Sequence, residues 1–206
     1  MAKLYFRYGA MNCGKTALLL QAVHNYEDRG MRILILKPES DTKGGNRVVS
    51  RIGLEREVDH IVGRDENLYE YLNDKLDDVK CIFVDESQFL KREQVDDLMQ
   101  VTVLHDIPVI CYGLRTDFLT NGFPGSTRLL EIAHTNEELK TICKCGAKAT
   151  YNARFVNGVP VFEGEQVAID GEDLVTYDSM CPKCYYESRK KFMESKGKTL
   201  VKTKDN

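Results

Sequence analysis

A single stretch decides the fold of this chain: Gly9-Ala10-Met11-Asn12-Cys13-Gly14-Lys15-Thr16. It is a complete G-x-x-x-x-G-K-[ST] octet, the pattern of a phosphate-binding loop. Residues 3–8 before it are typical of a short strand, and the apolar residues of 18–26 after it fall on one face of a helix. A glycine-containing turn that binds nothing is the alternative. The order strand, loop and helix favours a nucleoside triphosphate site.

The octet also predicts how a triphosphate is held. Gly9 and Gly14 let the backbone come close to the phosphates, because a side chain there would block the approach. Lys15 is expected to hold the β- and γ-phosphates, and the hydroxyl of Thr16 is expected to bind Mg²⁺. We therefore predict that the octet binds ATP together with Mg²⁺.

Length and composition limit the class of protein and its possible partners. The 206 residues, 42% hydrophobic and 30% charged, describe a globular chain with one domain and an appendage, or two small domains. The net charge of −3 argues against general binding to nucleic acid or membrane surfaces. Without a membrane-spanning run or a signal-peptide core, and with clustered cysteines, the chain is expected in the cytoplasm.

The order of elements predicts an α/β fold. The apolar runs 31–36, 81–84 and 107–112 are typical of buried parallel strands, and residues 68–76 and 91–105 have helical spacing. Alternation of this kind predicts a phosphate-loop NTPase-like parallel sheet with flanking helices, which binds ligands at the carboxyl ends of its strands. The polar segment 39–56 is either a solvated loop or a cation-rich loop that touches phosphates.

Two acids, Asp85 and Glu86, follow the buried run 81–84 directly. In a phosphate-loop protein, an acid at the end of a later strand completes the Mg²⁺ site, directly or through water. The alternative is that Asp85 caps the next turn while Glu86 faces solvent. Their position beside the predicted phosphate site favours the first interpretation.

Four late cysteines pair up as Cys143-Lys144-Cys145 and Cys181-Pro182-Lys183-Cys184. Two cysteine pairs separated by strand-like residues are typical of a zinc ribbon, although the first pair is one residue shorter than C-x-x-C. Free thiols are the alternative. We expect a structural Zn²⁺ held by all four, in a domain of residues 141–190 that follows the α/β domain 1–140 and precedes a basic, disordered tail, 191–206. The insert 151–179 is either a passive loop or a lid that excludes water.

Together these features resemble the small, tetrameric, zinc-containing thymidine kinases (the cytosolic type II family). The resemblance rests on the phosphate loop with Met11, the segment Asp85-Glu86-Ser87-Gln88-Phe89, Gly113-Leu114 before a phenylalanine-bearing loop, and the cysteine ribbon. It implies a homotetrameric kinase that uses ATP, Mg²⁺ and structural Zn²⁺ to phosphorylate the 5′-hydroxyl of thymidine or deoxyuridine.

The resemblance also assigns roles. It implies that Glu86 is the catalytic base, that Asp85 supports Mg²⁺ and that Gln88 contacts the nucleotide phosphates. The family's Asp-x-Arg pair matches Asp41 and Lys43, where lysine loses the bidentate fork; Arg47 or Arg51 is the alternative. The implied nucleoside-binding residues line the thymine pocket, surround it, form the lasso loop or lie beside the sugar: Met11, Leu114, Phe118, Phe89, Phe123, Gln166, Val167, Ala168, Ile169 and Tyr177.

Two rival functions follow from the same residues. A phosphate-loop ATPase with a nucleic-acid-binding zinc ribbon would show a basic groove, whereas the cationic residues here are spread along the chain. A nucleotide sensor without catalysis would need neither Glu86 beside Asp85 nor an aromatic pocket. We therefore predict thymidine and ATP as the partners and expect no nucleic acid or membrane.

Overall fold

The computed structural model describes residues 1–41, 44–166 and 174–197. The chain forms two compact units. The first comprises Met1–Gly9, Cys13–Arg115 and Gly122–Leu139. The second comprises Ala10–Asn12, Thr116–Asn121 and the chain from Lys140 onward. The chain thus changes unit between Leu139 and Lys140, and two earlier segments also belong to the second unit.

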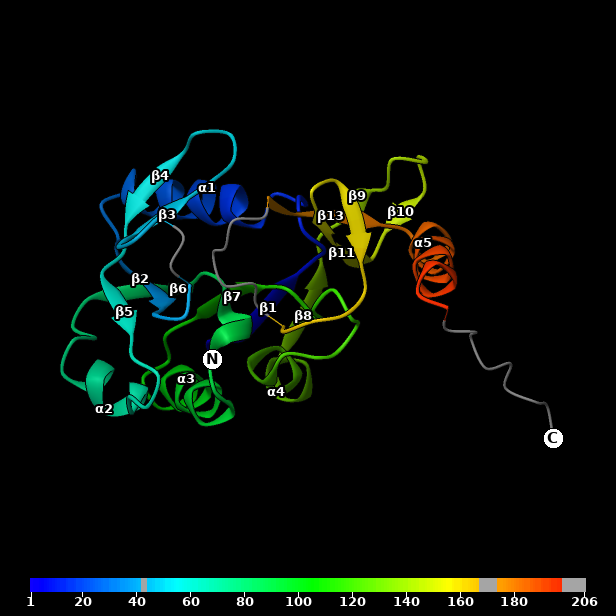
Figure 1. Ribbon diagram of the computed structural model, residues 1–206. Helices are drawn as coiled ribbons and strands as arrows, with labels where there is room; N and C mark the ends of the chain where they lie inside the picture. Colours follow the sequence, from blue (N-terminus) through cyan, green and yellow to red (C-terminus); the bar gives the residue numbers. More distant parts are fainter. Residues whose placement is uncertain (42–43, 167–173, 198–206) are drawn as a thin grey trace. The chain divides into compact units, whose positions relative to one another are not determined.

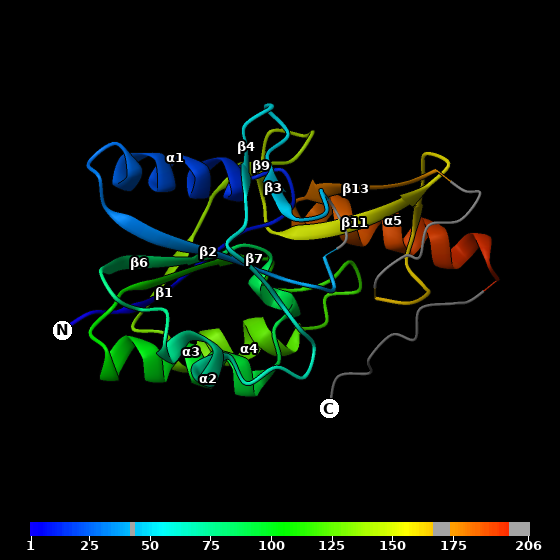
Figure 2. The same ribbon diagram turned by 90° about the vertical axis from the view of Figure 1, so that its left-hand side faces the viewer.

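A six-stranded parallel sheet forms the centre of the first unit, in the order β5-β2-β6-β7-β1-β8. Figures 1 and 2 show helix α1 over one face of this sheet and helices α2, α3 and α4 over the other. This arrangement confirms the predicted fold class. The strands are β1 (Leu4–Tyr8), β2 (Arg32–Pro38), β5 (His60–Val62), β6 (Val79–Val84), β7 (Val109–Gly113) and β8 (Thr135–Glu138). The helices are α1 (Lys15–Glu27), α2 (Leu68–Asn73), the 3-10 turn η1 (Ser87–Phe89), α3 (Arg92–Leu104) and α4 (Pro124–Ile132).

The central strands are buried on both faces, which explains their continuous apolar runs. Because side chains alternate along a strand, Leu34 and Leu36 of β2 join the core under α2, α3 and α4, whereas Ile33 and Ile35 join the core under α1. Strand β6 divides its side chains in the same way. Because these strands are parallel, the carboxyl ends of β1, β6 and β7 lie at one edge of the sheet.

Part of the polar segment 39–56 is a hairpin rather than a loop. Strands β3 (Arg47–Val49) and β4 (Glu55–Glu57) pair in antiparallel fashion. Val48 is buried in the core under α1, while Arg47 forms ion pairs with Glu55 and Glu57 across the hairpin. One buried residue among charges carries no periodic signal, so the hairpin escaped the sequence prediction.

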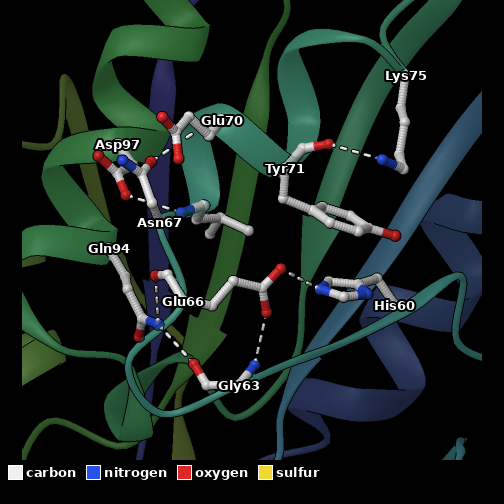
Figure 3. A network of polar contacts seen from close by, with 10 residues as sticks. His60, Gly63, Glu66, Asn67, Glu70, Tyr71, Lys75, Gln94 and Asp97 are labelled. Carbon is white, nitrogen blue, oxygen red and sulfur yellow. Dashed lines mark hydrogen bonds and ion pairs between the residues drawn. The ribbon is translucent and has the colours of Figure 1, made fainter.

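Edge strand β5 is fixed by polar contacts around Glu66 (Figure 3). One Glu66 oxygen lies 2.7 Å from the His60 Nε2 atom and the other accepts a hydrogen bond of 2.7 Å from the Gly63 N–H. The Gln94 side chain donates to the Gly63 carbonyl at 2.8 Å, and the His60 ring stacks on Tyr71 with 3.6 Å between centroids. These contacts join β5 to α2 and α3.

The second unit is built from two small sheets and a helix. Strands β9 (Thr141–Ile142) and β10 (Lys148–Ala149) form one sheet, and β12 (Val159–Val161), β11 (Tyr151–Val156) and β13 (Val175–Met180) form the other. Helix α5 (Pro182–Ser195) packs Tyr185 into a core with Phe162 and Ala153. It extends into the predicted tail, whose residues 198–206 lie outside the described part of the chain. Within the described residues, no helix has the length and apolar character needed to cross a membrane.

Candidate active site

The phosphate loop connects β1 to α1. Gly14 has φ 82° and Asn12 has φ 64°, so the loop turns through the left-handed region before the helix begins at Lys15. A Cβ on Gly9 would lie 2.5 Å from Cys13 Sγ and 2.7 Å from the Leu139 carbonyl oxygen, so only glycine fits there. The Lys15 ammonium lies 3.4 Å from the Gly9 carbonyl oxygen, against the loop. The geometry is that of an anion-binding loop at a helix N-terminus.

Asp85 lies at the carboxyl end of β6 with 4% of its surface exposed. One carboxylate oxygen accepts a hydrogen bond of 3.4 Å from the Thr16 hydroxyl. The other is the one buried side-chain oxygen or nitrogen of the described residues that has no hydrogen-bond partner. Burial, followed by the charge of Glu86, raises the pKa of Asp85 to about 7. A buried, half-partnered carboxylate beside the loop threonine fits the donor set of a Mg²⁺ site.

Glu86 adopts a left-handed backbone conformation, φ 48° and ψ 36°, at the start of η1. This conformation costs a residue other than glycine about 1–2 kcal/mol and is found most often where function requires it. The Gln88 amide donates to the Glu86 carboxylate and accepts a hydrogen bond of 3.0 Å from the Leu114 N–H. Gln88 is 1% exposed and satisfied within the protein, so its contact with nucleotide phosphates stays a prediction.

The predicted apolar residues of the first unit gather around η1. The Phe89 and Phe123 rings meet edge to face, with 5.6 Å between centroids. Leu114 and Phe123 are buried, and the Leu114 carbonyl accepts a hydrogen bond from the Ser126 hydroxyl. The structure therefore brings these three together with Glu86 and Gln88 at the carboxyl end of β6 and β7.

The middle of the phosphate loop is held within the second unit. The Met11 N–H donates to the Asn152 side chain at 2.8 Å, and the Asn152 amide donates to the Thr116 carbonyl at 2.8 Å. The Asn12 amide donates to Asp178 at 3.2 Å. Residues 10–12 are thus positioned by side chains from β11 and β13.

The remaining predicted nucleoside residues also belong to the second unit. Phe118 is buried, with the Arg154 guanidinium 3.7 Å above its ring centroid. The Tyr177 hydroxyl accepts a hydrogen bond of 3.0 Å from Arg154, and the Gln166 amide donates to Asp117 at 3.2 Å. Val167, Ala168 and Ile169 lie outside the described residues.

The four late cysteines converge. Their sulfur atoms lie within 4.8 Å of one another, and the Cys145 and Cys181 sulfurs are 3.6 Å apart. A tetrahedral Zn²⁺ with Zn–S bonds of about 2.3 Å separates its sulfurs by about 3.8 Å, so the cluster has the size of a zinc site. Burial opposes ionisation of Cys143, but N–H groups and neighbouring thiols outweigh it and lower the pKa of that thiol to about 7. The short first pair reaches the cluster because Gly146, at φ 87°, closes a tight turn.

Sequence reasoning missed Asp117, Asn152 and Arg154. Asp117 stands in a loop, where no periodicity marks it. Asn152 and Arg154 alternate along β11 and therefore point to the same face, where both are buried. Two polar residues at this spacing in a strand were the available signal.

A phosphate loop and a buried acid at the carboxyl edge of a parallel sheet define a phosphate-loop nucleotide-binding protein. The family described as thymidine kinase matches residues 2–185. The chain is 47% identical to the thymidine kinase of Enterobacteria phage T4 over 195 residues, covering 93% of this chain and 99% of the phage protein. It is 46% identical to that of Ruegeria pomeroyi over 192 residues (91% and 96% covered) and 48% identical to that of Rhodopirellula baltica over 184 residues (88% and 86% covered).

This chain belongs to the thymidine kinase family. The family predicted from the motifs is thereby confirmed, and with it an ATP-dependent kinase.

Proposed function

We propose that this protein transfers the γ-phosphoryl group of ATP to the 5′-hydroxyl of thymidine to give thymidine monophosphate. Deoxyuridine lacks only a methyl group, which an apolar pocket discriminates by about 1–3 kcal/mol, so we expect it to be a second substrate. The family supports the substrate class. The observation that carries the mechanism is the position of Glu86: it follows the buried Asp85 directly, its backbone is left-handed, and its carboxylate accepts a hydrogen bond from Gln88.

The phosphate loop and Asp85 hold the triphosphate and its metal ion in this reaction. The loop N–H groups and Lys15 hold the triphosphate and stabilise the charge that spreads over the moving phosphoryl group. Asp85 and Thr16 are the residues that would hold Mg²⁺, because Asp85 is buried beside the Thr16 hydroxyl with one oxygen unpartnered. When bound, Mg²⁺ supplies positive charge to the β- and γ-phosphates.

Glu86 orients the attacking hydroxyl and accepts its proton. In a loose transition state the proton moves late, so the position of the carboxylate counts for more than its basicity. The hydrogen bond from Gln88 and the fixed backbone at Glu86 supply that position. The proposed nucleoside-binding residues are Met11, Phe89, Leu114, Phe118, Phe123, Gln166, Val167, Ala168, Ile169 and Tyr177.

The variant Glu86→Gln tests this role. Glutamine keeps the shape of the side chain and can still accept from Gln88, but it cannot take a proton. We expect turnover to fall by at least about a hundredfold while ATP binding survives. Glu93→Gln, on the exposed first turn of α3, is the matched control. A purified Glu86→Gln enzyme with unchanged turnover would remove Glu86 from the mechanism.

A panel of nucleosides tests the substrate. Thymidine, deoxyuridine, deoxycytidine and deoxyguanosine are assayed in parallel with ATP and Mg²⁺, with a control that lacks nucleoside. We expect turnover with the first two alone. ATP hydrolysis that ignores the nucleoside, and that rises on addition of DNA or RNA, would favour the ATPase alternative.

Three further proposals concern the metal site, the cellular compartment and the oligomeric state. We propose that Cys143, Cys145, Cys181 and Cys184 bind one structural Zn²⁺, supported by the sulfur spacing. Because thiolate ligands persist in reducing compartments, we place the protein in the cytoplasm. The homotetramer implied by the resemblance is tested by light scattering on a size-exclusion column.

A further inference from the structure

Arg154 is a buried cation in the middle of β11, with 5% of its surface exposed. Its Nε atom donates to the Tyr177 hydroxyl at 3.0 Å. Its Nη2 atom donates to two consecutive carbonyl oxygens, of Glu165 at 2.6 Å and of Gln166 at 3.2 Å. The guanidinium carbon lies 3.7 Å from the Phe118 ring centroid and 5.4 Å from that of Tyr177.

These partners are unusual for a buried charge. Buried cations are normally paired with a carboxylate, because removing a charge from water is costly. Within the described residues Arg154 forms no ion pair, and aromatic faces, a phenol and carbonyl oxygens surround it instead. Stability alone does not account for such a charge, since an apolar side chain of similar length would fill the same space without the desolvation cost.

What the partners share is their predicted task. Phe118, Tyr177 and Gln166 come from three separate parts of the chain, and each is proposed above to bind the nucleoside. Arg154 contacts all three at once. A planar guanidinium can do this because its donors lie in a fixed fork while its face stays free to stack on a ring.

Asp117 makes a second connection among the same parts. One of its oxygens accepts from the backbone N–H groups of Leu119 and Asn121, at 2.8 Å each, which fixes the loop that carries Phe118. The other accepts from the Gln166 amide. The Phe118 loop and Gln166 are therefore joined twice, through Asp117 and through Arg154.

We propose that Arg154 is a positioning residue for nucleoside binding: it holds the Phe118 ring, the Tyr177 hydroxyl and the backbone carbonyls of Glu165 and Gln166 in a single arrangement. It acts through these groups and leaves the phosphate loop and the acids at β6 unaffected. The inference rests on the proposed function. It predicts a defect confined to the nucleoside, with ATP binding preserved.

Arg154→Met and Arg154→Lys test it. Methionine keeps an unbranched side chain over Phe118 but removes every donor, whereas lysine keeps the charge and loses the fork. Arg189→Met on α5 is the matched control. For each variant we would measure kcat, the KM values of thymidine and of ATP, thymidine binding by calorimetry, and the thermal midpoint.

We expect Arg154→Met to raise the thymidine KM and Kd by roughly 10- to 100-fold, as loss of charge-assisted hydrogen bonds implies. The ATP KM should stay within about twofold, and Arg154→Lys should recover part of the loss. A thymidine KM within twofold of the parent, or equal rises for both substrates with a lowered thermal midpoint in both variants, would overturn the proposal. If Arg154→Met does not fold, the proposal is tested with Arg154→Lys alone, by comparing its rise in thymidine KM with its rise in ATP KM. Failure of the parent to phosphorylate thymidine would instead reject the proposed function.

Discussion

Gly125, near the start of α4, makes a strong test of how the turn that carries Glu86 is held. A Cβ at this position would lie 2.5 Å from the Ser87 carbonyl oxygen, 2.7 Å from that of Leu90 and 3.1 Å from that of Gln88. Helix propensity favours alanine over glycine in a helix by about 1 kcal/mol. Packing against three backbone oxygens opposes it. Whether Gly125→Ala raises or lowers the stability of the protein therefore decides whether helix propensity or packing dominates.

The contacts predict that packing dominates. Carbon and oxygen atoms do not approach to 2.5 Å without a bond, so the turn must retreat by more than about 0.5 Å. Overpacking of this kind costs about 1–3 kcal/mol, and in a chain of this length each kcal/mol lowers the thermal midpoint by about 2–4 °C. Because Glu86 directly precedes Ser87, the retreat also displaces the proposed base. A misplacement near 1 Å costs up to about a hundredfold in rate, so we expect at least a tenfold loss of kcat.

Calorimetry measures the thermal midpoint, and a coupled kinase assay measures kcat. Gly63→Ala is the matched control, because its nearest contact would be the Glu66 carboxylate at 3.4 Å, an ordinary distance. We expect the control to keep the parent's midpoint and turnover. A Gly125→Ala enzyme that is as stable as the parent, or more stable, with normal kcat would show that the turn has room for the Cβ and that packing does not dominate.

Three shorter predictions concern other parts of the molecule. Alkylation of Cys13, a half-buried thiol within the phosphate loop, should abolish turnover. ATP with Mg²⁺ should slow the alkylation, and the Cys13→Ala variant should keep its turnover after the same treatment. If alkylation inactivates that variant equally, another thiol is responsible. Removal of zinc by a chelator should release one ion per chain, measured with a metal indicator, and lower the thermal midpoint, and Cys184→Ser should bind less zinc from the start. Burial and the nearby Glu86 raise the pKa of Asp85 from 3.8 to about 7, so the stability that its protonated form contributes is complete below pH 3.8 and lost as the pH rises through 7. Without Mg²⁺, Asp85→Asn should therefore have a larger free energy of unfolding in urea than the parent at pH 8, and this difference should disappear as the pH is lowered below 3.8.

The central sheet could be predicted because its signals are local. Ile33, Leu34, Ile35 and Leu36 supply apolar side chains to both faces of β2, so the continuous run itself reports burial on two sides. The phosphate loop is equally local, since its conformation depends on glycines within the octet. Neither inference needs knowledge of a distant residue.

Edge strand β8 shows why other elements escaped. Thr135-Asn136-Glu137-Glu138 contains no apolar residue, and it is a strand because it pairs with β1, more than a hundred positions earlier. An ion pair between Arg7 and Glu137 joins the same two strands. Asn152 is a similar case, because its partner Met11 is 141 positions away. No window along the sequence holds both members of such pairs.

Glu86 stands between these two cases. Its position after a buried strand is a local signal, but its orientation depends on what surrounds the turn 87–90. On one side, a Cβ on Gly113 would lie 2.8 Å from both the Gln88 Oε1 and the Ser87 Oγ atoms; on the other, Gly125 meets the backbone of the turn. In the sequence both glycines look like ordinary loop or helix boundaries. In the fold each glycine leaves the space that the turn occupies, so the orientation of the proposed base depends on the absence of a side chain at Gly113 and at Gly125.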